Sequence, residues 1–237
     1  MRESATVNKF GGHSAVGTAY TGLSQEVSAD STFGWLTAAD ELRVKAGGNA
    51  ADDQDGGAGA LAITLEGLDA NLNPITEVIE PEGADVGTKS TQQFFRLNRA
   101  FVSSVGTYSA ANTGDIDIET EGGTLMARIV GGEGQTQQGR YTIPDGFYGE
   151  LKYALFTPDK AKDTNFRMMH RPDADDVATP FAGARILGEF THLAAPLTWQ
   201  PSEGMFLPPK TDIWVEALVS ASTGDARANF EIELHRA

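Results

Sequence analysis

Short stretches of residues that alternate in polarity run through most of this chain, and this pattern restricts the fold more than any other feature. Apolar and polar or small residues alternate over 61–66, 115–119 and 228–235. Such alternation buries one face of a strand and leaves the other in solvent, as in antiparallel sheets packed as sandwiches or barrels. The only segments that could be helical, around Ala161 and Ala174, are short and polar. The sequence therefore predicts an all-β fold.

The spacing of turn residues predicts how these strands are grouped. Gly, Pro, Asn and Asp clusters recur about every 8–12 residues, which is typical of sandwiches. The segment GGEGQTQQG at 131–139 has no large apolar anchor and reads as a domain boundary. We therefore expect two tandem antiparallel β-sandwich or jelly-roll-like domains, 41–135 and 136–237. Residues 1–40 are expected to form an irregular N-terminal arm and a first strand.

Individual segments give more specific expectations. Residues 60–67 and 76–80 read as a hairpin, and the apolar-rich run 92–105 reads as one bulged strand or two short strands. Residues 193–212 contain four prolines, so they cannot form a central strand. We expect them to form an extended connection on the surface.

Charge and cysteine content exclude several classes of function. Asp and Glu number 33 against 18 Lys and Arg, which gives a net charge of −15. Such a surface repels both nucleic acids and anionic membranes. There is no cysteine, so stability has to come from packing or assembly. The start, MRESATVNKFGG, has no apolar core, and no run of about 18 apolar residues occurs, so we expect no signal peptide, no transmembrane helix and synthesis in the cytoplasm.

Two acidic clusters are weak candidates for calcium, and no other cofactor is expected. Asp52, Asp53 and Asp55 lie in one loop, and hard cations prefer several carboxylates within a tight turn. No Glu closes the site as in the twelve-residue calcium loop, so a solvated Asp-rich turn is the favoured interpretation. The same holds for the acids of residues 173–176.

No catalytic motif is recognisable, so we predict that the protein is not an enzyme. The four histidines are far apart in sequence and show no metal-ligand spacing. The segment Gly12-His13-Ser14 lacks the second glycine and the strand-to-helix turn of a nucleophile elbow. A hydrolase on a β-scaffold is the least favoured hypothesis.

Four aromatic residues are candidates for an interface, namely Trp35, Trp199, Phe206 and Trp214. In residues 213–219 (IWVEALV) both faces of the strand carry apolar side chains. One face must therefore be covered by the proline-rich connection, the other domain or another subunit. We favour the first two of these over a ligand site. The alternative is a sugar-binding platform formed by the aromatic residues Trp35, Trp199, Trp214, Tyr148 and Tyr153.

Several segments together resemble a known group of proteins. They are ELRVKAGGNAADDQDGGAGALAITLEGLDANLNPITEVIEPEG, FFRLNRAFVSSVGTYSAANTGDIDI, GEGQTQQGRYTIPDGFYGELK, LPPKTDIWVEA and ARANFEIEL. In their order and motifs they are similar to a group of uncharacterised virion structural proteins of mostly marine tailed bacteriophages. The resemblance covers most of residues 7–237, and its motifs are structural. It implies a virion component that is present in many copies and has no enzymatic role.

The predicted function is that of a virion structural protein of a tailed phage: a capsid decoration, head-fibre or tail-associated subunit. It would be located in the virion and bind copies of itself and other virion proteins, with the arm lying across a neighbour. The alternative is a receptor- or carbohydrate-binding β-module, stabilised by calcium at the acidic loop.

Overall fold

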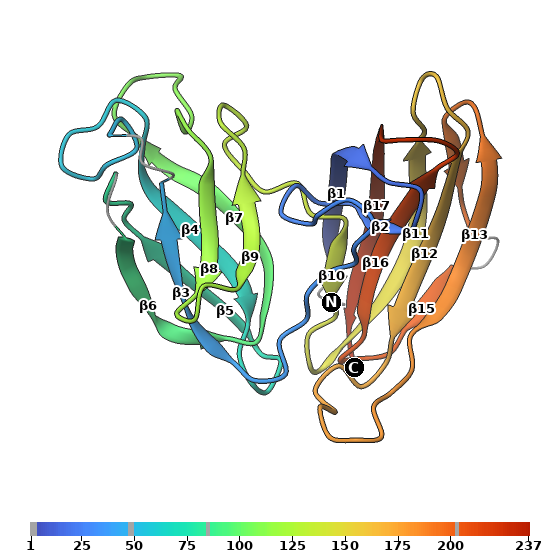
Figure 1. Cartoon of the computed structure of the whole chain (residues 1–237). Helices are drawn as coiled ribbons and strands as arrows, with labels where there is room; N and C mark the ends of the chain where they lie inside the picture. The colour runs from blue at the N-terminus through green and yellow to red at the C-terminus, as the bar shows by residue number, and fades with distance from the viewer. Residues whose placement is uncertain (1–3, 47–49, 84–85, 202–203) are drawn as a thin grey trace. The chain divides into compact units, whose positions relative to one another are not determined.

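A computed structural model describes residues 4–46, 50–83, 86–201 and 204–237, and these residues form strands, turns and loops without a helix (Figure 1). The predicted all-β fold is confirmed. No segment among them is a helix that could span a membrane. The chain divides into two compact units. We call Met1–Gly34 with Gln137–Ala237 the jelly-roll unit, and Trp35–Thr136, which lies between its two parts in sequence, the inserted unit.

The jelly-roll unit consists of two antiparallel sheets. Sheet A has the order β1-β17-β11-β14, with β15 also paired to β11, and sheet B has the order β10-β16-β12-β13, with β2 also paired to β16. The strands of sheet A are β1 (Ser4–Val16), β11 (Phe147–Thr157), β14 (Leu197–Trp199), β15 (Met205–Leu207) and β17 (Gly224–Arg236). Those of sheet B are β2 (Thr21–Gly22), β10 (Arg140–Thr142), β12 (Thr164–Arg171), β13 (Arg185–Leu193) and β16 (Asp212–Val219).

The pairing between these strands is nested from the ends of the chain inward. The first strand pairs with the last, β10 with β16, β11 with β14 and β15, and β12 with β13, all antiparallel. Successive pairs alternate between sheet A and sheet B. A long antiparallel hairpin wound into two facing four-stranded sheets in this way is a jelly roll. The jelly-roll-like fold expected from the sequence is therefore present, but it is built from both ends of the chain.

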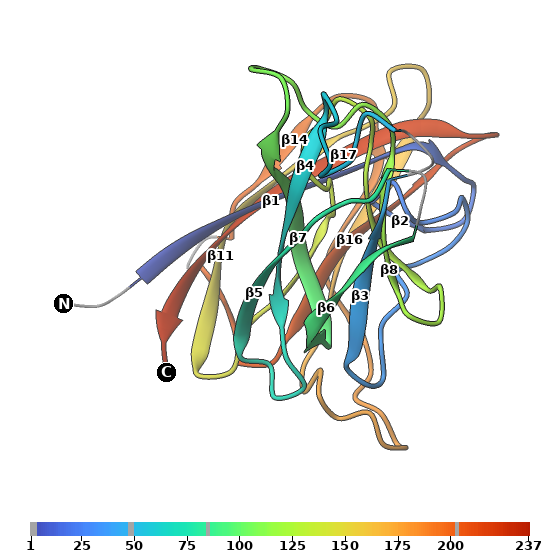
Figure 2. The same cartoon turned by 90° about the vertical axis from the view of Figure 1, so that its left-hand side faces the viewer.

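The predicted irregular arm is wrong for residues 4–16, which form the 13-residue strand β1. This strand lies along β17 from Ser4 opposite His235 to His13 opposite Ala226, and the two run side by side in Figures 1 and 2. The alternation is concealed because Lys9, opposite buried Phe230, takes an inward position. The first 34 residues thus belong to the same unit as the C-terminal strands, and not to a separate arm.

The outer face of sheet B carries charged side chains that are nevertheless buried. Asp212 binds Arg171 and Glu216 binds Arg167, each at 2.5 Å, and the two carboxylates are almost inaccessible. Trp214 lies between them in the strand, and its Nε1 donates to Glu216 Oε1 at 2.7 Å. This is the second face of the strand IWVEALV. On this face, which points away from the core, the buried side chains are the polar Asp212 and Glu216 and the aromatic Trp214.

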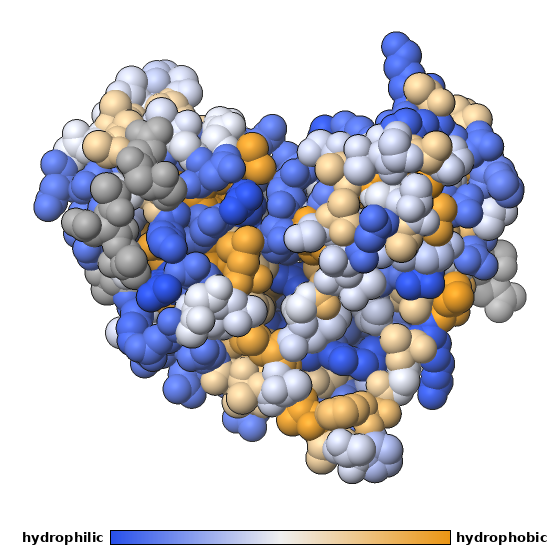
Figure 3. All heavy atoms as spheres, in the orientation of Figure 1, coloured by the Kyte–Doolittle hydropathy of each residue, from blue (hydrophilic) through white to orange (hydrophobic). Residues whose placement is uncertain are grey.

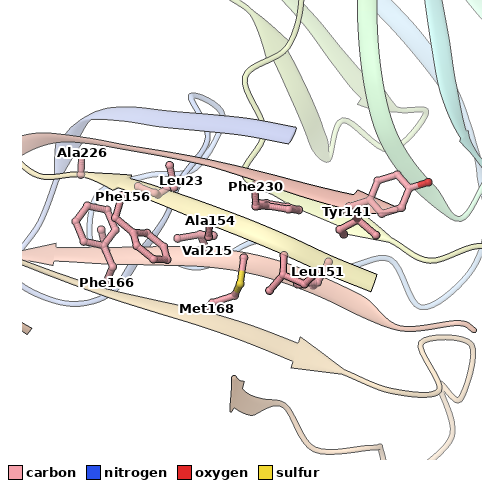
Figure 4. Close-up of a cluster of buried hydrophobic side chains, with 14 of the residues drawn as sticks. Leu23, Tyr141, Leu151, Ala154, Phe156, Phe166, Met168, Val215, Ala226 and Phe230 are labelled. Carbon is pink, nitrogen blue, oxygen red and sulfur yellow. The ribbon is translucent and has the colours of Figure 1, made fainter. Parts of the chain in front are cut away.

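The inner faces of sheets A and B form one hydrophobic core, part of which Figure 4 shows. Phe156, Phe166 and Phe230 are at most 1% exposed, and the rings of Phe156 and Phe166 lie 5.2 Å apart. Each buried phenyl group stabilises the fold by about 1.5–3 kcal/mol relative to an exposed one. A shared core between two sheets is the defining property of a sandwich.

The inserted unit is a second sandwich, made of a four-stranded and a three-stranded sheet that share a core. The sheets have the orders β6-β3-β8-β9 and β5-β4-β7. Their strands are β3 (Asp40–Lys45), β4 (Ala60–Leu68), β5 (Pro74–Ile79), β6 (Val86–Phe94), β7 (Arg96–Val105), β8 (Ile116–Thr120) and β9 (Leu125–Ile129).

The more specific expectations can be compared with these strands. The hairpin predicted over 60–67 and 76–80 is confirmed as β4 and β5. The run 92–105 spans the end of β6 and all of β7, which divide at Phe95, so the interpretation as two strands was correct. The proline-rich stretch contains two strands of three residues each, and both pair with β11 at the edge of sheet A.

Close packing of β1 leads to a first prediction. A Cβ atom on Gly11 would lie 2.1 Å from the carbonyl oxygen of Leu23 and 2.2 Å from the amide nitrogen of Gly139. We expect Gly11→Ala to lower the free energy of unfolding by about 2–4 kcal/mol, because backbone atoms have to move. Gly183→Ala is the control, since a Cβ there meets nothing within 4 Å. Urea unfolding measures both variants, and equal stabilities would contradict the tight crossing.

Tyr20, just before β2, gives a pH-dependent prediction. Its hydroxyl donates to Glu189 Oε1 at 2.9 Å, and burial together with this bond raises the pKa of Tyr20 to about 12. The folded state thus favours the protonated phenol. The resulting stabilisation is complete below pH ~10 and is lost as pH rises toward about 12. We expect Tyr20→Phe to lose about 0.5–1.5 kcal/mol at pH 8 and to show a weaker decline in alkali. Unfolding curves between pH 8 and 11 measure this, and parallel curves for both proteins would contradict it.

Candidate functional site

Asp52, the first of the predicted calcium ligands, is a structural residue of the inserted unit. Its side chain is fully buried. Oδ1 accepts hydrogen bonds from the backbone N–H groups of Ala60 and Thr113, both at 2.8 Å, and Oδ2 accepts from Thr113 at 3.0 Å and Gly114 at 2.8 Å. The carboxylate thereby joins three segments of chain. The calcium prediction is wrong for Asp52, because its oxygens already bind backbone donors away from solvent.

One further acid of each cluster, Asp53 and Asp175, also has a partner within the chain. Asp53 Oδ1 accepts from the backbone N–H of Asp55 at 2.9 Å, which is a turn contact. In the second cluster, Asp175 accepts from Lys210 Nζ at 2.8 Å, and this hydrogen bond raises the pKa of Lys210. The cation beside the second cluster is thus a lysine of the protein itself.

Glu150, Glu233 and His235 form a group that the sequence did not reveal, on β11 and β17 of sheet A. His235 Nε2 lies 3.2 Å from Glu150 and 4.0 Å from Glu233. Two carboxylates and an imidazole are donors suited to a divalent metal. However, Lys152 Nζ lies 2.9 Å from Glu150 and 3.6 Å from Glu233, and its hydrogen bond lowers the pKa of Glu150. The lysine already pairs with both carboxylates, so the group acts as an ion-pair network across the two strands.

Two of the four aromatic interface candidates pack inside the protein. Trp214 is 6% exposed and bonded to Glu216, so it offers no surface to a partner, and the interface prediction is wrong for it. Trp199 is partly buried against the core, with its ring 5.3 Å from that of Phe190.

The other two candidates differ in their exposure. Trp35, in the inserted unit, is partly buried, and the guanidinium of Arg96 lies over its ring at 5.1 Å. Phe206 on β15 is 64% exposed. Among the four, only Phe206 presents a largely free aromatic surface.

Phe206 belongs to a set of exposed apolar side chains that share one end of the jelly-roll unit. Tyr148 is the second residue of β11, Ile186 is the second of β13, and β15 pairs with the start of β11. Val177 and Phe181 lie in the connection from β12 to β13. All five therefore lie where β12 and β17 end and β11 and β13 begin. We call these five residues the end patch, and they comprise every large apolar side chain that is exposed in the described part of this unit.

Backbone hydrogen bonds hold the loops at this end together. The N–H of Ala174 donates to the carbonyl of Lys210 at 2.8 Å, and the N–H of Lys210 donates to that of Ile143 at 3.0 Å. The N–H of Ala237 donates to the carbonyl of Gly146 at 2.8 Å. The loops beside the end patch are thus connected to one another, so less order has to be gained on binding than with free loops.

The chain beside the end patch is exposed and poor in charge. No residue from Asp175 to Gln200 is buried, although this stretch includes the whole of β13 and β14. Between Val177 and Gln200 the only charged side chains are Arg185 and Glu189, whereas 22% of the whole chain is charged. Figure 3 shows apolar atoms gathered at the lower end of this unit. Tyr148 and Phe206 project from the outer face of sheet A and Ile186 projects from that of sheet B, so the five side chains share one end of the unit but not one continuous surface.

Of the five residues, the sequence pointed to Phe206 as an interface candidate and to Tyr148 only as part of a sugar-binding platform, and it did not reveal the other three. Tyr148 and Ile186 belong to ordinary alternating strands, and the pattern does not say which apolar side chains remain uncovered. The scarcity of charge after Val177 was visible in the sequence. Read as an interface signal, it could have located the patch.

Comparisons with known proteins identify no family. No family model matches the chain, and no curated protein matches it. Among solved structures, it is similar to a chain in the structure of infectious bursal disease virus of the Gt strain. The identity is 9%, the match covers all of this chain and 73% of that chain, and the TM-score is 0.28. For T=1 particles derived from the same virus the identity is 11%, over 99% of this chain and 70% of that one, at a TM-score of 0.25. These scores are too low to carry an argument, so the fold rests on the strand pairing.

The burial of Asp52 predicts that calcium does not stabilise the protein through this residue. We expect Asp52→Asn to lower the free energy of unfolding of the inserted unit by about 2–3 kcal/mol, because its amide group turns a donor toward a backbone N–H. Added calcium should leave the melting temperature of the wild type unchanged. Thermal unfolding with calcium or with a chelator measures both effects, and Asp55→Asn is the exposed control. A calcium-dependent rise that Asp52→Asn abolishes would contradict this assignment.

Proposed function

We propose that the protein is a structural subunit of a virus particle and acts by assembly with copies of itself and other virion proteins, not by catalysis. The end patch is the observation that supports this most strongly. Five large apolar side chains, 38–64% exposed, lie at one end of a unit in a chain of net charge −15. Apolar side chains that stay exposed at one end of a unit are available for contact with another protein.

Two further observations support the proposal. The nested strand pairing is a jelly roll, a fold used by viral capsid proteins but also by lectins and cupins, so the fold alone does not decide. Sequence segments such as GEGQTQQGRYTIPDGFYGELK resemble virion proteins of tailed phages. Within this class we propose a capsid decoration, head-fibre or tail-associated subunit that is located in the virion.

The alternative, a carbohydrate- or receptor-binding module, finds less support. Sugar platforms need a flat, exposed aromatic ring, but Trp199 packs on Phe190 and Trp214 is buried. Asp52, which would have anchored a stabilising calcium ion, is bound to backbone N–H groups. Trp199, Trp214 and Asp52, on which this alternative depended, therefore have structural partners.

Analysis of purified particles tests the proposal. We expect quantitative mass spectrometry of gradient-purified virus from the source culture to detect the protein at many copies per particle. An antibody against it should also label intact particles in electron micrographs. Presence in infected cells but absence from purified particles would contradict the proposal.

A further inference from the structure

We propose that the outer face of sheet A binds a neutral oligosaccharide. The site consists of side chains on β11, β15 and β17, and we call it the sheet A site: Tyr148, Glu150, Phe206, Glu233 and His235. This inference goes beyond the proposed function and does not rest on it, because a subunit of a particle can also carry a binding site. It uses neither the tryptophans nor the acidic loop on which the carbohydrate-binding alternative depended.

Strand register places these five side chains on one face of the sheet. Glu150 pairs with Phe206 on one side and with Glu233 on the other, and Tyr148 pairs with His235. Side chains of directly opposite residues in antiparallel strands point to the same face. The positions that alternate with them point into the core and are filled by Leu151, Leu207, Ile232 and Leu234. The five side chains therefore point away from the core.

The two aromatic side chains of the site present flat surfaces to solvent. Phe206 is 64% exposed and Tyr148 is 44% exposed. Because Phe206 lies opposite Glu150, it is diagonal to Tyr148, and residues in such positions are about 7–8 Å apart. This distance is within the span of a short oligosaccharide. The electron-rich face of an aromatic ring attracts C–H groups, and a pyranose ring presents such groups on its own flat face.

The polar side chains of the site are held in fixed positions. Lys152 Nζ lies 2.9 Å from Glu150 and 3.6 Å from Glu233, and His235 Nε2 lies 3.2 Å from Glu150. The hydrogen bond from Lys152 lowers the pKa of Glu150, which is therefore ionised at neutral pH. An ionised carboxylate accepts about four hydrogen bonds, so acceptor sites remain for hydroxyl groups of a ligand. Side chains that already hold one another lose little freedom on binding.

The charges on this face favour a neutral ligand over an ionic one. Glu150, Glu231 and Glu233 all lie on the outer face of sheet A, in a chain of net charge −15, so an anion is repelled. A cation would have to displace Lys152, which already pairs with Glu150 and Glu233. A neutral polyhydroxy compound meets neither obstacle, because its hydroxyl groups donate to the carboxylates without replacing the lysine.

The same arrangement disfavours a protein partner with an apolar surface. The exposed rings of Tyr148 and Phe206 are flanked by the ion pair of Glu150 and Lys152 and not by further apolar side chains. The cores of protein interfaces are depleted in charged residues, because burying charges without new hydrogen bonds costs free energy. A saccharide provides hydroxyl groups for the charged side chains and C–H groups for the rings.

Uncharged polar side chains continue this face beyond the sheet A site. Thr6 and Asn8 on β1 lie opposite Glu233 and Glu231, and Asn229 is the next outward position of β17. All three of these uncharged residues are exposed. Hydroxyl and amide groups both donate and accept hydrogen bonds, as sugar hydroxyl groups require. Further sugar units can therefore follow the face toward β1.

An array of neutral oligosaccharides tests this inference on the full chain. The array carries oligomers of glucose, mannose, galactose and N-acetylglucosamine, and calorimetry with the best of them measures Kd. We expect binding by the wild type and a loss of at least about tenfold for Tyr148→Ala with Phe206→Ala, because both stacking surfaces are removed. The control Tyr108→Ala with Phe181→Ala removes the same two ring types at side chains that are 98% and 57% exposed, and should change Kd less than about twofold. Circular dichroism and thermal unfolding verify that both variants are folded.

Salt and charged probes provide a second readout that does not depend on substitutions. Because the ligand is neutral, we expect Kd to change less than about twofold when NaCl is raised from about 50 to 500 mM. Heparin oligosaccharides and oligolysine are the charged probes. Binding of either charged probe without binding of any neutral oligomer would overturn the neutral ligand, and so would binding that disappears with salt.

The outcomes separate this inference from the proposed function. A wild type that binds none of the neutral oligomers at a protein concentration of about 100 μM overturns the inference. Binding that the Tyr148 and Phe206 double variant retains overturns the sheet A site. Each of these results leaves the proposed function intact if the protein is found in purified particles, whereas absence from particles contradicts that function whether or not a saccharide binds.

Discussion

The pairing of β1 with β17 is the interaction on which the jelly-roll unit depends. It closes sheet A with the first and last strands of the chain, which are separated by more than 200 residues. Beyond β1 the chain crosses to sheet B. There the N–H of Leu23 donates to the carbonyl of Val215, and the carbonyl of Leu23 accepts from the N–H of Gly139. This crossing passes so close to Gly11 that a side chain there has no room. The N-terminal residues therefore connect both sheets of the unit.

The position of the N-terminal segment against the rest of the unit also accounts for a buried ion pair. Glu26, in the segment that follows β1, lies 3.7 Å from Arg140 of β10, and each side chain is only 5% exposed. Gln138 Nε2 donates to the same carboxylate at 3.2 Å. A buried ion pair adds little net stability, but removing one partner is costly, so such pairs favour a single arrangement. We interpret the contacts of Glu26 as fixing the register of the N-terminal segment against the second half of the unit.

The sequence predicted the strands that local alternation and turn residues specify. It did not predict the pairing between strands that are far apart in the chain. Strands such as 60–68 and 116–120 were recognised because one face is apolar. Strand β1 was not, because Lys9 takes an inward position and Gly11 and Gly12 have no side chain to signal a face. Acid-rich loops look alike in sequence whether a carboxylate binds a cation or, as in Asp52, backbone N–H groups. The end patch depends on which apolar side chains remain uncovered, and that is decided by the whole fold.

Hydrogen exchange of the full chain, followed by mass spectrometry, tests the closure most directly. If β1 completes sheet A, the amides of β1 that bond to β17 are protected by the same opening free energy as β17 itself, because the unit opens as a whole. Peptides covering 4–16 would then retain about half of their amide protons, as expected for an edge strand, for as long as peptides covering 224–236 do. Complete exchange of 4–16 within seconds, with β17 still protected, would show a free arm and contradict this account of the fold.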